Sequence, residues 1–103
     1  MAKYRNVKTV VDNITFASKR EAARYQELKI LESAGQITGL ELQRRFPIKV
    51  NGLKICEYVS DFYYFDKDGG AVIEDVKGVK TPVYKLKKKL MLAIHGIDIR
   101  EIT

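Results

Sequence analysis

Asp61, Asp75 and Lys77 are the residues whose types and spacing are best suited to chemistry. Asp61 lies within an apolar-aromatic run, and Asp75 and Lys77 stand two residues apart at the end of the next apolar run. Side chains alternate between the two faces of a strand, so Asp75 and Lys77 are predicted to share one face. Between the runs, Asp66–Gly70 predicts a hairpin turn. A three-residue loop in that turn would place Asp61 directly opposite Asp75.

Two acids that face each other across a hairpin favour a bound cation. Like charges directly opposite are destabilising, and a carboxylate with apolar neighbours is unfavourable unless it is paired or bound to a metal. Asp61 is expected to share its face with Val59, Tyr63 and Phe65. The pattern therefore predicts a site for Mg²⁺ or Mn²⁺. The alternative is that these are ordinary strand-end acids, since Asp-x-Lys often arises by chance.

Three further acids leave alternatives open. Glu74 adjoins Asp75, and a β-bulge would exchange the faces of the two residues. Glu21 stands three residues after Ser18, a spacing typical of a capping box; it is also a candidate third acid of the site. Glu27 lies on the same predicted helix and competes with Glu21 as the inward-facing acid.

Periodicity and turn residues predict one α/β domain over residues 1–103, with residues 1–7 as a flexible N-terminal segment. The elements expected are a hairpin within Lys8–Phe16, a helix from Ser18 to about Ser33, an edge strand over Leu40–Val50, strands over Glu57–Phe65 and Ala71–Lys77, a helix from Thr81–Pro82 to Gly96, and a strand within Ile97–Ile102. The second helix is expected to dock through its apolar stripe, Val83, Leu86, Leu90 and Ile94.

Composition narrows the class of protein. The formal net charge of +6 favours a polyanionic partner. No apolar run is long enough for a membrane span, no secretory signal is evident, and the single Cys56 cannot form an internal disulfide, so we expect a cytoplasmic location. His95 is the only histidine; it is expected to cap a helix rather than to catalyse. No Walker loop or dinucleotide-binding glycine pattern is present.

Basic residues cluster around the predicted second helix, where no acid lies between Lys77 and Asp98. A surface of one sign so close to a candidate metal site suggests a track for a phosphate backbone; the alternative is a solvated helix face. The predicted DNA-binding residues are Arg44, Arg45, Lys80, Lys85, Lys87, Lys88 and Lys89.

These motifs together resemble the PD-(D/E)XK nuclease superfamily, and in particular small phage-encoded nucleases similar to Holliday-junction resolvases. The segments that carry the resemblance are Phe16–Ala22, Leu42–Gln43, Tyr58–Phe62, Glu74–Gly78 and Tyr84–Leu90. The resemblance spans roughly residues 8 to 102 and implies a mixed sheet flanked by helices in α-β-β-β-α-β order. Ser60 stands where the superfamily name has proline, which relatives often lack.

The resemblance also implies a role for each site residue. Asp61 and Asp75 would hold Mg²⁺ or Mn²⁺ together with the Val76 carbonyl, and Glu21 would complete the acid cluster. Lys77 would orient or help to deprotonate the attacking water. The remaining residue, Gln43, would lie near the scissile phosphate.

We therefore expect a metal-dependent endonuclease that acts on branched DNA, in a host cytoplasm if phage-encoded, as a homodimer without membrane association. The alternatives are a non-catalytic DNA-binding module on a nuclease-like fold and a phage structural or interaction protein whose basic face binds another protein.

Overall fold

The computed structural model describes residues 7–103, so most of the predicted flexible segment lies outside the described residues. These residues form a mixed α/β fold. The elements are β1 (Thr9–Val11), β2 (Ile14–Phe16), α1 (Lys19–Ser33), β3 (Thr38–Leu42), β4 (Arg45–Val50), β5 (Leu53–Val59), β6 (Phe62–Phe65), β7 (Ala71–Val76), α2 (Pro82–Leu90), the π-helical turn η1 (Met91–His95) and β8 (Arg100–Ile102). None of the described helices is long and apolar enough to cross a membrane.

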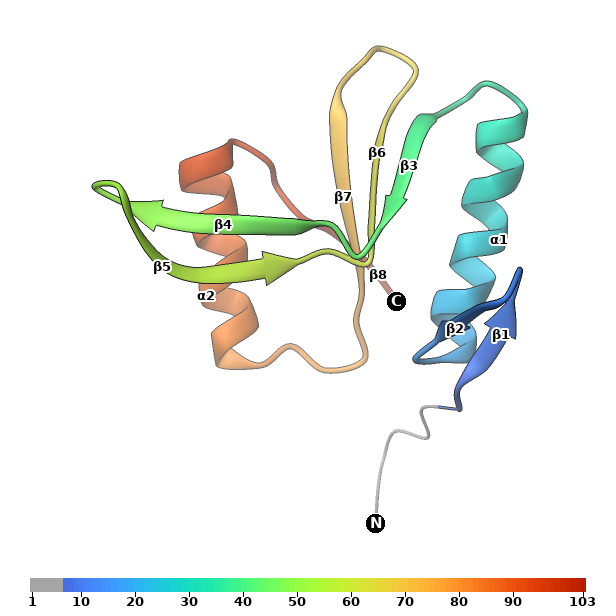
Figure 1. Cartoon of the computed structure of the whole chain (residues 1–103), viewed down its shortest axis with the longest axis horizontal. Helices are drawn as coiled ribbons and strands as arrows, with labels where there is room; N and C mark the ends of the chain where they lie inside the picture. The colour runs from blue at the N-terminus through green and yellow to red at the C-terminus, as the bar shows by residue number, and fades with distance from the viewer. Residues whose placement is uncertain (1–6) are drawn as a thin grey trace.

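The central sheet has four strands in the order β3-β6-β7-β8 (Figure 1). β6 pairs antiparallel with β3 and β7, and β8 pairs parallel with β7. Counting only the two helices and the strands of this sheet, the chain order is α-β-β-β-α-β, as predicted. The β4–β5 hairpin is an addition between β3 and β6 that extends away from the sheet (Figure 1).

β3–β6 and β4–β5 form one long two-stranded ribbon with a bend. Gln43 N–H donates to the Asp61 carbonyl at 3.2 Å, and Ser60 N–H donates to the Arg44 carbonyl at 3.0 Å. The prediction of unbroken strands over Leu40–Val50 and Glu57–Phe65 is therefore wrong. The cause lies in the left-handed φ of 55° at Gln43 and in the buried Ser60, whose hydroxyl also donates to Arg44 O. This bend sets the position of Asp61.

Alternate residues of β6 and β7 enter two different cores on opposite faces of the sheet. On one face, Phe62, Tyr64 and Val72 pack with α1 and β2. On the other, Tyr63 and Ile73 pack with α2, η1 and the β4–β5 hairpin. Figure 1 shows α1 and α2 on the two sides of the sheet. A residue's place in β7 thus decides which helix it meets.

The predicted helix boundaries are confirmed. Ser18 caps α1 by accepting a hydrogen bond from Glu21 N–H, and Gly35, with a φ of 76°, follows its end. Thr81 caps α2 in the same way, with Pro82 in its first turn. Gly96 terminates η1 with a φ of 71°.

The face through which α2 docks differs from the prediction. Tyr84 and Met91 are buried, whereas the predicted stripe residues Val83 and Leu86 are 62% and 57% exposed. The helix is oriented instead by polar contacts with the last strand and the loop before it. The Tyr84 hydroxyl donates to Glu101, and Lys88 Nζ donates to Asp98 and to the Ile99 carbonyl.

Candidate active site

The β6–β7 hairpin has the predicted turn and, as far as Phe62, the predicted register. Asp66 N–H donates to Gly70 O at 2.8 Å, which closes a three-residue loop. The Asp66 carboxylate also accepts the Gly70 N–H at 2.8 Å, and a Cβ at Gly70 would lie only 3.0 Å from that carboxylate. The strand pairing runs without a bulge from Phe65 opposite Ala71 to Phe62 opposite Glu74. Asp61 lies just beyond this pairing, where its N–H donates to the Glu74 carbonyl at 3.2 Å, so the predicted pairing of Asp61 with Asp75 is not part of the regular register.

Asp61 is held at the mouth of this hairpin by the backbone of β7. Its Oδ2 accepts the Val76 N–H at 2.7 Å. Burial raises the pKa of Asp61 to about 7, an effect that the Val76 N–H opposes and that the nearby charges of Asp75 and Glu21 reinforce. The site therefore gathers more negative charge than its own residues neutralise.

Asp75 makes two contacts from β7. The Tyr58 hydroxyl of β5 donates to Asp75 Oδ2 at 2.6 Å, and Lys77 Nζ lies 3.2 Å from Asp75 Oδ1. Lys77 Nζ also lies 4.1 Å from the centroid of the Tyr84 ring, a cation–π contact. Asp75 is 4% exposed, so it reaches solvent only at its edge.

Glu21 approaches the two aspartates from the first turn of α1. Its pKa is raised by burial and then by Asp75. Among residues 7–103 no hydrogen bond engages its carboxylate, so the reciprocal bond of a capping box is not formed. Glu27 does not compete for this place, since it is exposed and pairs with Arg24 at 3.1 Å.

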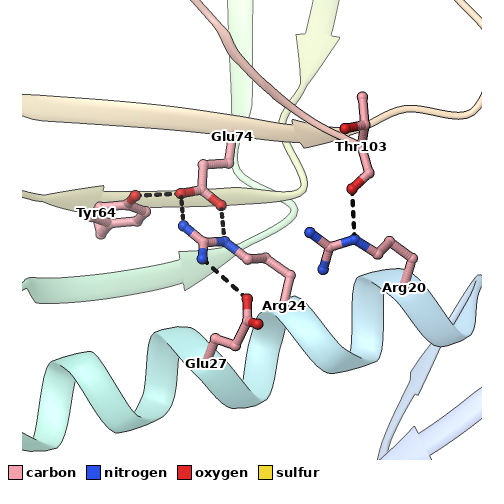
Figure 2. Close-up of polar contacts among 6 residues, drawn as sticks. All are labelled: Arg20, Arg24, Glu27, Tyr64, Glu74 and Thr103. Carbon is pink, nitrogen blue, oxygen red and sulfur yellow. Dashed lines mark hydrogen bonds and ion pairs between the residues drawn. The ribbon is translucent and has the colours of Figure 1, made fainter.

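Glu74 occupies the opposite face of β7 and belongs to a separate cluster. Arg24 of α1 donates to its two carboxylate oxygens at 2.8 and 2.6 Å, and the Tyr64 hydroxyl donates to Oε2 (Figure 2). Glu74 is completely buried. Its hydrogen bond raises the pKa of Arg24, and burial raises the pKa of Tyr64 to about 12. Glu74 is thus enclosed in the core, and Asp75 is the acid that shares a face with Lys77.

The chain is hollowed on both sides of Lys77. One cavity, of about 490 Å³, includes Glu21, Val76 and Lys77 in its wall. The other, of about 290 Å³, is lined by Asp75 and Lys77 together with residues of β5 and α2. Glu21, Asp75 and Lys77 are therefore reachable from solvent although they are partly buried, whereas Asp61 lines neither cavity.

The predicted phosphate ligands fall into two groups. Gln43 is exposed and lies beside Asp61 through its backbone. Four basic residues are in ion pairs: Arg44 with Glu41, Arg45 with Glu57, Lys80 with Glu101, and Lys88 with Asp98. Within the described residues, Lys85, Lys87 and Lys89 have no acidic partner.

The donor chemistry of the site fits a hard divalent cation. Carboxylates and a main-chain carbonyl are the ligands that Mg²⁺ and Mn²⁺ accept. Asp75 lies near enough to Asp61 for its charge to raise the pKa of Asp61, and Asp61 Oδ2 accepts the Val76 N–H. Within residues 7–103, however, no three His, Cys, Asp or Glu side chains are already arranged around one ion position. Lys77 lies against Asp75 instead. An ion could use this pair only if Lys77 moves away from Asp75.

Sequence reasoning missed Tyr58, the partner of Asp75, and Arg24, the partner of Glu74. Tyr58 comes from the far side of the bend in the ribbon, so its approach to Asp75 could not be read from strand periodicity. A signal was available for Arg24: it stands one helical turn after Glu21, and Glu74 stands one residue before Asp75. If Glu21 approaches Asp75, Arg24 is well placed to approach the neighbouring acid.

Comparison with known proteins adds the family but no activity. A search of curated proteins and a search of solved structures each gave no significant match. A family model described as "Protein of unknown function (DUF1064)" matches residues 1–101. Since the match covers nearly the whole sequence, the chain belongs to the DUF1064 family.

Proposed function

We propose that this protein is a metal-dependent DNA endonuclease with a PD-(D/E)XK-type fold. The observation that carries the proposal is the gathering of Asp61, Asp75, Lys77 and Glu21 at the end of β7, beside solvent-accessible cavities. The order of the sheet strands and helices agrees with that fold, and the motifs described above resemble the superfamily.

The resemblance gives each residue a role that its surroundings allow. Asp61 and Asp75 supply carboxylate oxygens for Mg²⁺ or Mn²⁺, with the Val76 carbonyl as a further ligand and Glu21 completing the negative cluster. A bound divalent cation supplies charge neutralisation at the phosphate and a water of lowered pKa. Lys77, released from Asp75, would stabilise the charge that develops on the phosphate oxygens. Tyr58 holds Asp75 in place through its hydrogen bond.

The basic face supports DNA as the substrate. Lys85, Lys87 and Lys89 have no acidic partner within the described residues and offer cations to a phosphate backbone. A domain of this size without an evident base-reading helix suits recognition of shape, so branched DNA is the proposed substrate. Two symmetric cuts in a junction would require a two-fold homodimer, which we include in the proposal.

One observation favours a second candidate, a DNA-binding module without catalysis. The Lys77 ammonium lies 3.2 Å from Asp75, and no three acids within residues 7–103 are arranged around one ion position. In such a module the ion pair would be permanent and Lys77 would serve only to neutralise Asp75. The two candidates differ in whether DNA is cut when Mg²⁺ or Mn²⁺ is present.

A cleavage panel separates the candidates. Duplex, flap, single-stranded and four-way-junction DNA are incubated with the protein and Mg²⁺ or Mn²⁺. We expect metal-dependent cutting, and Lys77→Ala should slow it roughly 10²- to 10³-fold, the usual effect of removing one group that stabilises the transition state. DNA affinity should change little.

The matched control is Lys67→Ala, which removes an exposed lysine from the turn of the same hairpin. It should cut at the wild-type rate. Full activity of Lys77→Ala, or cutting that persists in a chelator, would refute the mechanism. DNA binding without cutting of any substrate would support the non-catalytic module.

A further inference from the structure

The cavity on the α2 side of Lys77 differs from the acid cluster because apolar side chains form part of its lining. It measures about 290 Å³ and lies between β5 and the start of α2. Its apolar residues are Val59 and Val83, of which Val83 is largely exposed, together with the buried Tyr58 and Tyr84. We call this cavity the tyrosine recess. It adjoins Asp75 and Lys77 directly, so whatever fills it would lie beside the proposed reaction centre.

Most polar groups at the tyrosine recess are already engaged. The Tyr58 hydroxyl donates to Asp75 and the Tyr84 hydroxyl to Glu101. Thr81 Oγ accepts the Tyr84 N–H. The Glu57 carboxylate pairs with Arg45 at 2.7 Å and Lys54 at 3.2 Å. The two tyrosines are 3% and 6% exposed, so the open apolar surface of the recess comes mainly from Val83.

Lys87 is the exception. It lines the recess, is half-buried and has no acidic partner among residues 7–103. The recess thus combines an apolar wall with one cation that has no acidic partner within the described residues. A phosphate alone would leave the wall uncovered, and an apolar group alone would leave the ammonium without a partner. A nucleotide satisfies both, because its base is flat and its oxygen atoms accept hydrogen bonds.

We propose that the tyrosine recess receives one unpaired nucleotide of the DNA strand next to the phosphate at Asp75 and Lys77. A base within a duplex is stacked and paired, so moving it out of the duplex costs free energy. An unpaired base can enter the recess without that cost. The recess would therefore select single-stranded or branched DNA over duplex. This inference rests on the proposed function, since it assumes that DNA binds at this site. It adds that the recess is the reason for the preference for branched DNA.

The test measures binding without cleavage. Fluorescence anisotropy of labelled oligonucleotides is recorded in a chelating buffer, for one sequence presented single-stranded, as a flap and as a duplex. We expect the wild type to bind the unpaired forms roughly tenfold more tightly than the duplex. Val83→Trp fills the recess and should bring that ratio close to one.

The control is Leu86→Trp, which places the same side chain at a similarly exposed position of α2 outside the recess. It should retain the wild-type ratio. A second pair removes only charge: Lys87→Met should weaken binding to unpaired DNA more than to duplex, whereas Lys85→Met, exposed on the same helix, should affect both forms alike. Circular dichroism checks that each variant is folded.

The outcomes separate this inference from the proposed function. Equal affinity of the wild type for unpaired and duplex DNA, or a ratio unchanged by Val83→Trp, overturns the proposed role of the recess. Neither result bears on cleavage. Absence of cutting with Mg²⁺ or Mn²⁺ overturns the nuclease but not the binding ratio. Absence of binding to any DNA overturns both.

Discussion

Glu74 and Asp75 are neighbours on β7, yet their surroundings differ completely. Glu74 is completely buried and accepts hydrogen bonds to both oxygens from Arg24, with Tyr64 as a third donor. Asp75 lies on the other face, with one hydroxyl and one lysine, and has Asp61 and Glu21 nearby. The first carboxylate is neutralised by a cation dedicated to it. The second belongs to a cluster with more acids than cations.

This difference separates a structural charge from a candidate reactive one. A buried carboxylate with a bidentate arginine has no oxygen left for a ligand, so Glu74 joins α1 to the sheet. Asp75 borders a cavity, and its lysine could be displaced by a competing cation. The same sheet strand thus anchors a helix on one face and presents a candidate site on the other.

The largest effect we expect concerns stability on the Glu74 face. Arg24→Ala removes the cation and leaves a buried carboxylate uncompensated, which should lower the free energy of unfolding by roughly 3–5 kcal/mol. Urea denaturation measures it. Asp75→Asn, which relieves repulsion with Asp61, should be neutral or stabilising. The comparison between the two faces fails if both variants destabilise the protein equally.

Two controls sharpen this prediction. The double variant Arg24→Met with Glu74→Gln removes both charges and should recover much of the loss, because no buried ion then lacks a partner. Lys29→Ala breaks the exposed pair with Glu32 on the same helix and should change stability little. A large loss in Lys29→Ala would mean that α1 is sensitive to any change of charge.

How well the fold and the site could be predicted depended on how far apart in the sequence the interacting residues are. Local signals at Ser18, Gly35, Thr81 and Gly96 located the helix ends, and the loop after Asp66 fixed the register of β6 with β7 as far as Phe62 and Glu74. These features depend on residues a few positions apart. The alternation rule also separated Glu74 from Asp75, because β6–β7 contains no bulge.

The missed features depend on tertiary contacts. The bend at Gln43 requires a left-handed backbone conformation. The usual sequence signal for that conformation is a glycine, and this position has none. α2 docks through Tyr84 and through Leu90 of the predicted stripe, while Val83 and Leu86 of that stripe stay exposed. Tyr84 and Lys88 also find polar partners in β8 and the loop before it. Tyr58 reaches Asp75 only because the bend places the end of β5 on the face of the sheet where α2 packs.

A smaller effect should appear in the pH dependence on the Asp75 face. The pKa of Asp61 is raised from 3.8 to about 7. Its folded form therefore holds a proton that its unfolded form has lost, and stability present below pH 3.8 is lost as the pH rises to about 7. Asp61→Asn cannot ionise, and its amide oxygen can still accept the Val76 N–H.

The stability advantage of Asp61→Asn over the wild type should consequently grow by roughly 2 kcal/mol across this range. That value lies below the limit of about 1.4 kcal/mol per pKa unit because solvent screens a half-buried group. Urea midpoints at the two ends of the range measure it. An advantage independent of pH would show that the pKa of Asp61 is the same in the folded and unfolded forms, and would contradict the raised pKa on this face.

The smallest effect concerns the salt dependence of DNA binding. Here the comparison is between surface lysines that are paired with an acid and surface lysines that are not. Each phosphate contact contributes about −0.9 to the slope of log affinity against log salt on duplex DNA. Lys85→Met with Lys89→Met removes two cations that have no acidic partner within the described residues, so the slope should become shallower by nearly two contacts. Lys80→Met with Lys88→Met removes cations held by Glu101 and Asp98, and should change the slope less. Equal changes in the two double variants would mean that DNA displaces the acids and contacts all four lysines. No change in either variant would identify α2 as a solvated helix face, with the DNA contacts elsewhere.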